Sequence, residues 1–281
     1  MQPRLILLAP LALLAGGGRT ASAQDLPTSQ PAMITVIRER VKLGRNAEHA
    51  RLEAGWPAAF AKAKSPDYYL ALTSLTGANE AWFVVPFASH AAIAESMKRE
   101  AADPVLSAEL NRLQRADADL LDQVTTIQAL ARPELSRGPF PDLSKARFWE
   151  ISTWRMRPGH ERDFEAAARA YGSASDRAGS RTGYRVYQVL AGMPEPTFLI
   201  FVSVDDYAEF DQILADGNAT MSSTSEEEQE VFRKFSTEGL MSNETQRFRL
   251  DPGMSYVSPA VRASDPGFWI PKRAARPATQ P

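Results

Sequence analysis

The chain is built around a stretch that occurs twice in altered form: Val41-Lys42-Leu43-Gly44-Arg45-Asn46-Ala47-Glu48-His49 and Met156-Arg157-Pro158-Gly159-His160-Glu161-Arg162-Asp163-Phe164. In both copies a strand-forming run ends beside a basic residue, turns at a glycine and enters an amphipathic helical pattern. The two glycines are 115 positions apart, as are Trp56 and Tyr171. The offset grows slowly toward the ends of the copies and only across loops, so the sequence predicts an internal duplication.

Each half has the same predicted order of elements, strand–helix–strand–strand–helix–strand, with its second helical segment in two parts. In the first half we expect strands at 33–41, 68–75, 81–87 and 124–130, and helices at 46–64, 89–100 and from 104 onward. In the second half we expect strands at 148–156, 184–190, 197–204 and 244–250, helices at 160–171, 207–214 and 225–239, and loops at 172–183 and 216–223. Pro57 is expected to kink or break the first helix.

The 281 residues are enough for two domains of roughly 100 residues each. The predicted division is a signal peptide at 1–23, a flexible lead-in at 24–32, unit 1 at 33–136, a linker at 137–145, unit 2 at 146–256 and a proline-rich tail at 257–281. We expect the tail to lie along the surface or to be disordered, with Phe268-Trp269-Ile270 as the part that would pack on a domain.

The first residues have the pattern of a secretory signal peptide. Arg4 precedes an apolar run at 5–15, and Ala21-Ser22-Ala23 matches a small-x-small cleavage site, so we predict cleavage after Ala23. The run is shorter than the roughly 20 residues of a membrane span, which makes an uncleaved anchor the weaker alternative. The sequence contains no cysteine, so an exported chain would be held by its hydrophobic core alone. Together these features predict a periplasmic or secreted protein.

Composition and motifs exclude several function classes. A formal net charge of −2 with no long basic stripe disfavours nucleic-acid binding. The chain has no phosphate-binding glycine loop, no dinucleotide fingerprint and no Ser/His/Asp order. It has three histidines, and no two of them are spaced to bind one metal from a single helix. The sequence therefore predicts neither a metal site nor a cofactor.

A βαββαβ unit of about 100 residues is ferredoxin-like, and the entry from turn to helix at 156–164 resembles the dimeric α+β barrel superfamily. The NIPSNAP-like and antibiotic-biosynthesis-monooxygenase-like branches are the most similar, over 33–136 and 146–256. In that superfamily two units usually pair their sheets face to face between chains. A tandem copy implies that one chain can make this barrel within itself. Pairing of the sheets between two chains of a homodimer is the alternative. The fold class expected is thus α+β with two tandem ferredoxin-like units.

The resemblance implies a ligand between the open face of the sheet and its covering helices and loops. Glu150, Ser152 and Trp154 share one face of a predicted strand, and Glu39 is on the equivalent face in the first half. If this face points into the cleft between the sheets, either carboxylate could act as a base or a ligand anchor. The alternative is a structural ion pair, for which the candidate partners are Arg38, Arg155 and Arg185.

Histidine and aromatic residues supply the other candidates. His49 is on the apolar face of the first helix, where packing competes with an acid–base role. Tyr184 and Trp82 could line an aromatic pocket, although aromatic residues on strands more often belong to the core.

These observations favour a secreted protein that binds a small apolar molecule, or a partner protein, without an evident catalytic constellation. Two alternatives follow from the superfamily, whose members include cofactor-free oxygenases, haem-handling enzymes and proteins without known activity. One is a cofactor-free monooxygenase or isomerase that uses Glu150 and His49. The other is a haem-handling protein, which requires a histidine facing the cleft and which the sequence does not otherwise support.

Overall fold

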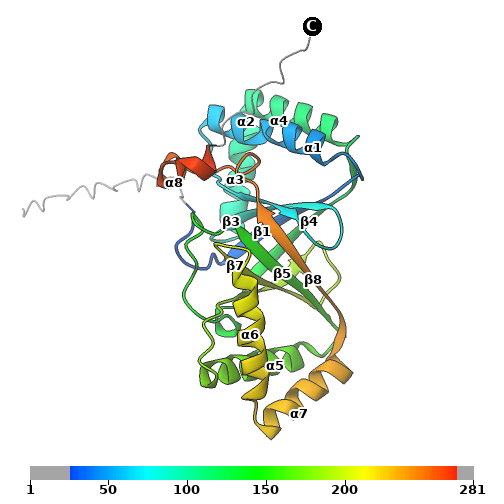
Figure 1. Cartoon of the computed structure of the whole chain (residues 1–281). Helices are drawn as coiled ribbons and strands as arrows, with labels where there is room; N and C mark the ends of the chain where they lie inside the picture. The colour runs from blue at the N-terminus through cyan, green and yellow to red at the C-terminus, as the bar shows by residue number, and fades with distance from the viewer. Residues whose placement is uncertain (1–25, 271–281) are drawn as a thin grey trace, which may run out of the picture.

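The computed structural model describes residues 26–270 of the chain (Figure 1). The predicted signal peptide at 1–23 and residues 271–281 of the tail lie outside the described residues. Within residues 26–270 no helix combines the length and the apolar character that crossing a bilayer requires.

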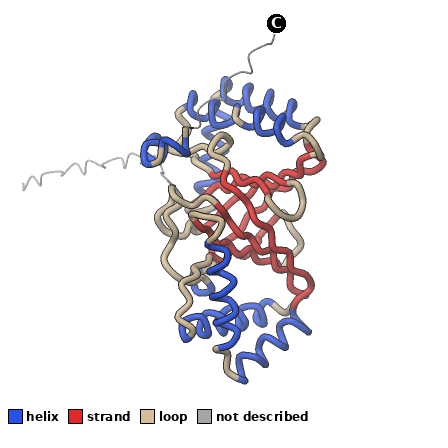
Figure 2. Tube along the Cα trace, viewed as in Figure 1, coloured by secondary structure: helices blue, strands red, loops and turns tan. Residues whose placement is uncertain are grey.

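The described residues form a closed barrel of eight antiparallel strands with helices on two opposite sides of it (Figures 1 and 2). Around the barrel the strand order is β1-β3-β2-β8-β5-β7-β6-β4. The first four strands are β1 (Met33–Val41), β2 (Leu70–Ser74), β3 (Glu80–Phe87) and β4 (Leu121–Ala131). The second four are β5 (Phe148–Met156), β6 (Arg185–Ala191), β7 (Thr197–Val204) and β8 (Leu240–Leu250). The barrel is closed by pairing of β2 with β8 and of β4 with β6.

The predicted duplication is visible in the pairing. Each half has its first strand between its third and fourth strands, as a ferredoxin-like unit requires. The register shifts between Arg40 and Val41 in one half and between Arg155 and Met156 in the other, again 115 positions apart. Gly44 and Gly159 follow these bulges with φ of 80° and 87°, a conformation that favours glycine. The predicted fold class, two tandem ferredoxin-like units forming one intramolecular barrel, is therefore confirmed.

Helices cover the outer faces of the two half-sheets. Unit 1, formed by β1–β4, carries α1 (Asn46–Glu53), α2 (Gly55–Ala63), α3 (His90–Ala102) and α4 (Pro104–Asp117). Unit 2, formed by β5–β8, carries α5 (Glu161–Arg177), α6 (Glu209–Ser222) and α7 (Glu226–Lys234), which continues as a π-helical turn at Phe235–Gly239. The two groups of helices lie on opposite sides of the barrel (Figure 1). After β4 comes a short 3-10 turn at Pro133–Leu135, and after β8 come α8 (Pro259–Ser264) and α9 (Pro266–Trp269).

Strand alternation divides the side chains between the barrel interior and the helix-covered faces. Ile34 and Val36 of β1 join Trp149 and Ile151 of β5 in one core cluster that draws on both units. The intervening residues of β1 and β5, Glu39 among them, point toward the helices. The face that carries Glu39 and Glu150 therefore lies between sheet and helices and not between the two sheets.

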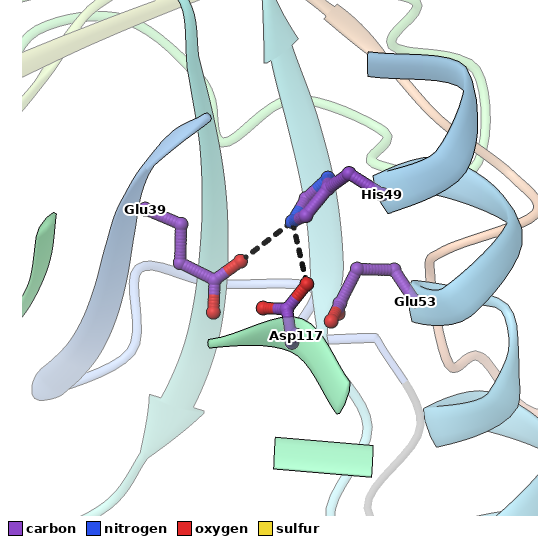
Figure 3. Close-up of side chains that lie close together, drawn as sticks. All are labelled: Glu39, His49, Glu53 and Asp117. Carbon is purple, nitrogen blue, oxygen red and sulfur yellow. Dashed lines mark hydrogen bonds and ion pairs between the residues drawn. The ribbon is translucent and has the colours of Figure 1, made fainter. Parts of the chain in front are cut away.

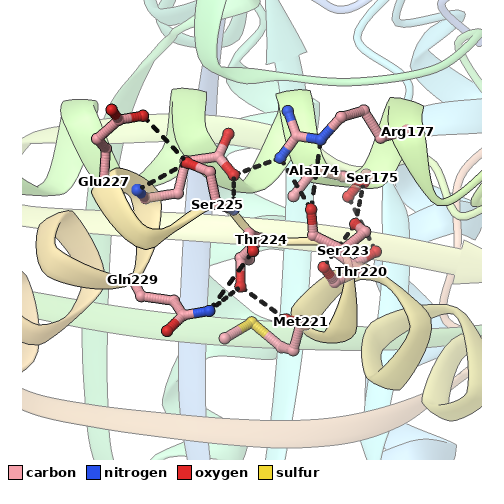
Figure 4. A network of polar contacts seen from close by, with 11 residues as sticks. Ala174, Ser175, Arg177, Thr220, Met221, Ser223, Thr224, Ser225, Glu227 and Gln229 are labelled. Atoms are coloured by element: carbon pink, nitrogen blue, oxygen red, sulfur yellow. Dashed lines mark hydrogen bonds and ion pairs between the residues drawn. The ribbon is translucent and has the colours of Figure 1, made fainter.

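Two helices of unit 2 are longer than predicted. The sequence indicated loops at 172–183 and 216–223, but α5 runs to Arg177 and α6 to Ser222. Small side chains, which weaken the helical signal locally, permit close packing here: the Ser175 and Thr220 hydroxyl oxygens are buried 3.2 Å apart. Ser223 Oγ also donates to the Ala174 carbonyl at 2.8 Å, and this network ties α5 to the α6–α7 turn (Figure 4).

The first helix breaks at a different residue from the one predicted. The break falls at Ala54, before Gly55, and Pro57 lies in the first turn of α2, where its missing N–H costs no hydrogen bond. A Cβ on Gly55 would lie 2.6 Å from Leu113 Cδ2 of α4, so glycine allows the two helices to approach.

The lead-in, linker and tail pack on the barrel in their described parts. Leu26, Leu143 and Trp269 are buried in the barrel core cluster. Trp269 Nε1 donates to the Ser144 carbonyl at 3.2 Å, so the tail covers the linker. The tail is not disordered at α8 and α9: Val261 and Trp269 are buried in the barrel core cluster, so the expected packing of the Phe268-Trp269-Ile270 segment is realised at Trp269.

Candidate functional site

Each unit has a cavity between the outer face of its half-sheet and its helices. The unit 1 cavity has a volume of about 440 Å³ and the unit 2 cavity about 640 Å³. A further cavity of about 380 Å³ is lined by residues of the linker and the barrel core. The two sheet–helix cavities occupy the place where a ligand was expected.

The unit 2 cavity brings together four of the predicted site residues. Glu150, Ser152 and Trp154 reach it from β5, and Tyr184 reaches it from the residue before β6. Most of the other lining side chains are aliphatic or aromatic and come from β6, β7, β8, α5, α6, α7 and the π-helical turn: Phe164, Ala167, Ala168, Tyr171, Val186, Ile200, Val202, Ile213, Met221, Phe232, Phe235 and Leu240.

One wall of this cavity is an aromatic stack. The rings of Trp154 and Phe235 are stacked with centroids 5.5 Å apart, and Phe164 lies 6.5 Å from Trp154. Aromatic side chains present large apolar surfaces with few rotatable bonds, so this wall is rigid as well as apolar.

The Glu150 carboxylate and the Ser152 hydroxyl on β5 are already paired, whereas the buried Trp154 Nε1 has no hydrogen-bond partner. Glu150 Oε2 accepts from Arg247 Nε at 3.0 Å, and the Ser152 and Thr245 hydroxyl oxygens are 2.7 Å apart. The ionic partner of Glu150 is thus on β8 and is none of the arginines considered from the sequence. Burial raises the pKa of Tyr184 to about 12, so this phenol is protonated at neutral pH.

In unit 1 the corresponding region between sheet and helices contains a polar cluster and not an aromatic stack. Glu39 of β1, His49 and Glu53 of α1 and Asp117 at the end of α4 converge, and one ligand atom from each lies within 4.8 Å of all the others (Figure 3). His49 Nε2 is 2.9 Å from Glu39 Oε2 and 3.8 Å from Asp117 Oδ1. All four residues are buried, with exposed fractions of 8% for Glu39 and at most 3% for the rest.

Burial and mutual repulsion govern the charges of this cluster. Desolvation, followed by the negative charges of Glu39 and Asp117, raises the pKa of Glu53 from its usual 4.5 to about 9. Desolvation and Glu39 raise the pKa of Asp117 to about 6, although His49 opposes the change. Burial, with a smaller contribution from Glu53, raises the pKa of the neighbouring Tyr69 well above 10.

The remaining predicted residues lie apart from these groupings. Trp82 is inside the barrel, where it is 1% exposed, donates to Glu80 at 2.9 Å and contacts Phe248. Its place is therefore in the core and not in a ligand pocket. Glu150 and His49 belong to units whose helices lie on opposite sides of the barrel (Figure 1), so the structure does not assemble them into one acid–base site.

Sequence reasoning missed Glu53 and Asp117. A signal for Glu53 was present, because His49 and Glu53 are four residues apart and so share one face of a helix. Asp117 belongs to another helix and gave no such signal.

The histidine that haem handling requires is not placed for it. The side chains that line the unit 2 cavity in the described chain include no histidine. His49 directs Nε2 at Glu39. The residues present therefore do not fit a histidine-ligated haem in either sheet–helix cavity.

No protein-family model and no curated protein matches this sequence, whereas several solved structures match the fold. A putative monooxygenase from Fusobacterium nucleatum aligns with TM-score 0.51 and 8% identity over 79% of this chain and 93% of that one. An anthrone oxidase-like protein aligns with TM-score 0.51 and 10% identity over 82% and 93%. A mutant chlorite dismutase from Candidatus Nitrospira defluvii aligns with TM-score 0.45 and 8% identity over 80% of this chain and 93% of that one.

The first two likenesses bear out the fold expected from the sequence. The chain has the dimeric α+β barrel fold, with both ferredoxin-like units in one polypeptide. At identities this low a shared fold carries no information about chemistry, so function has to be argued from the cavities of this chain.

Proposed function

We propose that the protein is exported to the periplasm or the medium and binds a small, largely apolar molecule in the unit 2 cavity. The observation that carries the proposal is a cavity of about 640 Å³ whose lining is predominantly aliphatic and aromatic. Export is supported by the signal-peptide pattern that ends at Ala23.

The cavity has the properties of a small-molecule site. Binding sites for such molecules usually enclose about 300–1,000 Å³, with apolar walls and a few polar groups that fix orientation. The Trp154 and Phe235 rings offer a flat face to a planar apolar body. Glu150 and Ser152 supply polar atoms on the β5 side. The ligand expected is therefore an apolar, preferably aromatic, molecule with a polar substituent.

The proposal is tested by filling the cavity. Ala168 of α5 lines it, so Ala168→Phe should occupy the space that the ligand needs. The matched control is Ala63→Phe, because Ala63 lines the unit 1 cavity from α2. A panel of aromatic compounds with one polar group, together with a hydrophobic fluorescent dye, would be screened against the wild type by melting temperature and by titration.

We expect a saturable ligand that raises the melting temperature of the wild type and of Ala63→Phe and loses at least about tenfold in affinity for Ala168→Phe. If no compound binds, or if Ala168→Phe binds as well as the wild type, the proposal fails. Capture of a protein in place of a small molecule, with unchanged affinity in Ala168→Phe, would replace it with the partner-protein alternative.

A further inference from the structure

Two buried carboxylate oxygens of the cluster in unit 1 have no hydrogen-bond partner. Glu53 is 3% exposed and its Oε1 has no hydrogen-bond partner, and Asp117, also 3% exposed, has none at Oδ1. The Glu53 carboxylate points toward Asp117 (Figure 3). Among the described residues, the one side chain capable of carrying positive charge that pairs with Glu39 and Asp117 is His49. Buried carboxylates that lack an opposite charge or hydrogen bonds lower the stability of the folded state.

Unit 2 shows that the fold does not require this polarity. At the offset of 115 the counterparts of Glu39, His49 and Glu53 are Trp154, Phe164 and Ala168. Asp117 comes four residues before Leu121 at the start of β4, and Phe235 comes five residues before Leu240 at the start of β8. At corresponding or neighbouring positions, unit 2 joins helix and sheet through the apolar stack of Trp154, Phe164 and Phe235, whereas unit 1 has three carboxylates and an imidazole there.

From this contrast we propose that Glu39, His49, Glu53 and Asp117 bind one divalent transition-metal ion of the Mn²⁺, Fe²⁺ or Zn²⁺ class. The ion would supply positive charge to the three carboxylates. The Glu53 and Asp117 oxygens that have no hydrogen-bond partner would become ligands of the ion. The inference is independent of ligand binding in unit 2, because the two sites share no residue.

The spacing of the donor atoms fits such an ion. Nitrogen and oxygen ligands lie about 2.0–2.2 Å from these metals, so donors on opposite sides of an ion are about 4 Å apart. The four donor atoms lie within 4.8 Å of one another, so small side-chain movements would bring them to bonding distance. They come from β1, α1 and the end of α4, so an ion would also tie two helices to the sheet (Figure 3).

The donor types set the class of metal. Carboxylates alone would suit Mg²⁺ or Ca²⁺, whereas an imidazole nitrogen favours first-row transition metals. No thiolate takes part, since the chain lacks cysteine, which disfavours the softer ions. Glu39 and Glu53 also line the unit 1 cavity, so an ion held here would border that cavity.

The test is metal binding by the purified full chain and three variants. After treatment with a chelator and desalting, the protein would be titrated with Mn²⁺ and Zn²⁺ by calorimetry and melting temperature. Co²⁺ would report the ligand set through its visible absorption. Glu53→Gln and Asp117→Asn each remove one proposed ligand while preserving side-chain shape. His160→Gln is the control, because it removes a histidine from the more exposed His160–Asp163 pair, whose atoms are 2.7 Å apart.

We expect one ion per chain and a rise in melting temperature of about 5–10 °C at a metal concentration near 100 times Kd. Loss of a direct ligand should weaken binding by more than the 10–100-fold that changing an indirect partner typically costs. His160→Gln should bind as the wild type does. The proposal is overturned if the wild type shows no saturable binding, or if Glu53→Gln retains full affinity and the same Co²⁺ spectrum. Circular dichroism establishes that each variant is folded, and Glu53→Gln decides the question should Asp117→Asn fail to fold.

Discussion

Replacing Glu53 with glutamine should stabilise the metal-free protein, and increasingly so as pH rises. The pKa of Glu53 is raised from 4.5 to about 9 by burial and by the charges of Glu39 and Asp117. The folded chain therefore holds a proton that the unfolded chain releases. Stability is greatest below pH 4.5 and is lost progressively as pH rises toward 9. Glutamine is neutral in both states, so the variant escapes this loss.

The difference in unfolding free energy between Glu53→Gln and the wild type depends on how far pH has risen between the two pKa values of Glu53, 4.5 unfolded and about 9 folded. Each pH unit between 4.5 and 9 costs the wild type about 1.4 kcal/mol relative to Glu53→Gln. The raised pKa of Asp117, about 6, adds a similar dependence mainly below pH 6, which both proteins share. The comparison is therefore cleanest from pH 6 to pH 8, where the difference in unfolding free energy should grow by about 3 kcal/mol.

The assay is urea unfolding in the presence of a chelator at pH 6, 7 and 8. Glu48→Gln is the matched control, because Glu48 is on the same helix but exposed. Its curves should keep the pH slope of the wild type. Parallel slopes for the wild type and Glu53→Gln, or a Glu53→Gln protein that is less stable at pH 8, would refute the reasoning.

Two structural predictions concern unit 2 and its junction with unit 1. A Cβ on Gly192 would lie 2.0 Å from a backbone oxygen of β4, so Gly192→Ala should cost about 3 kcal/mol or more in chemical unfolding. Gly159→Ala, with similar positive φ but no atom within 4 Å, should cost only about 1 kcal/mol, and equal costs would show that the contact is unimportant. Asp216 accepts hydrogen bonds from the loop at 180–182, so Asp216→Ala should lower the unfolding free energy by at least about 2 kcal/mol. Asp211→Ala on the exposed side of the same helix should be nearly neutral, and similar losses in both would contradict this assignment.

Local pattern accounts for much of the fold. The glycine turns at Gly44 and Gly159, the strand alternation and the capping box at Ser225 are short-range features, and each is realised in the structure. Prediction from local pattern failed where tertiary packing stabilised a helix in segments whose residues favour loops. The small residues near Ser175 and Thr220 indicated loops, yet they are helical because they allow α5 and α6 to approach closely.

The candidate site residues were also predicted in part from local pattern and in part not. Sequence alternation correctly grouped Glu150, Ser152 and Trp154 on one face, and that face lines the unit 2 cavity. It could not show whether the face pointed into the barrel or toward the helices, because period-two alternation distinguishes two faces without saying what covers them. Trp82 illustrates this limit, since its face turned out to be the barrel interior.

The sequence by itself determined the duplication, the order of strands and helices, and therefore the class of fold. These depend on contacts between residues close in the chain, or on comparing one half with the other. Only the tertiary structure decided how the barrel closes and which side chains meet across it. Asp117 joins Glu39 and His49 because α4 ends beside β1 and α1. A meeting of three elements depends on packing between distant segments, and no periodicity within any one of them records it.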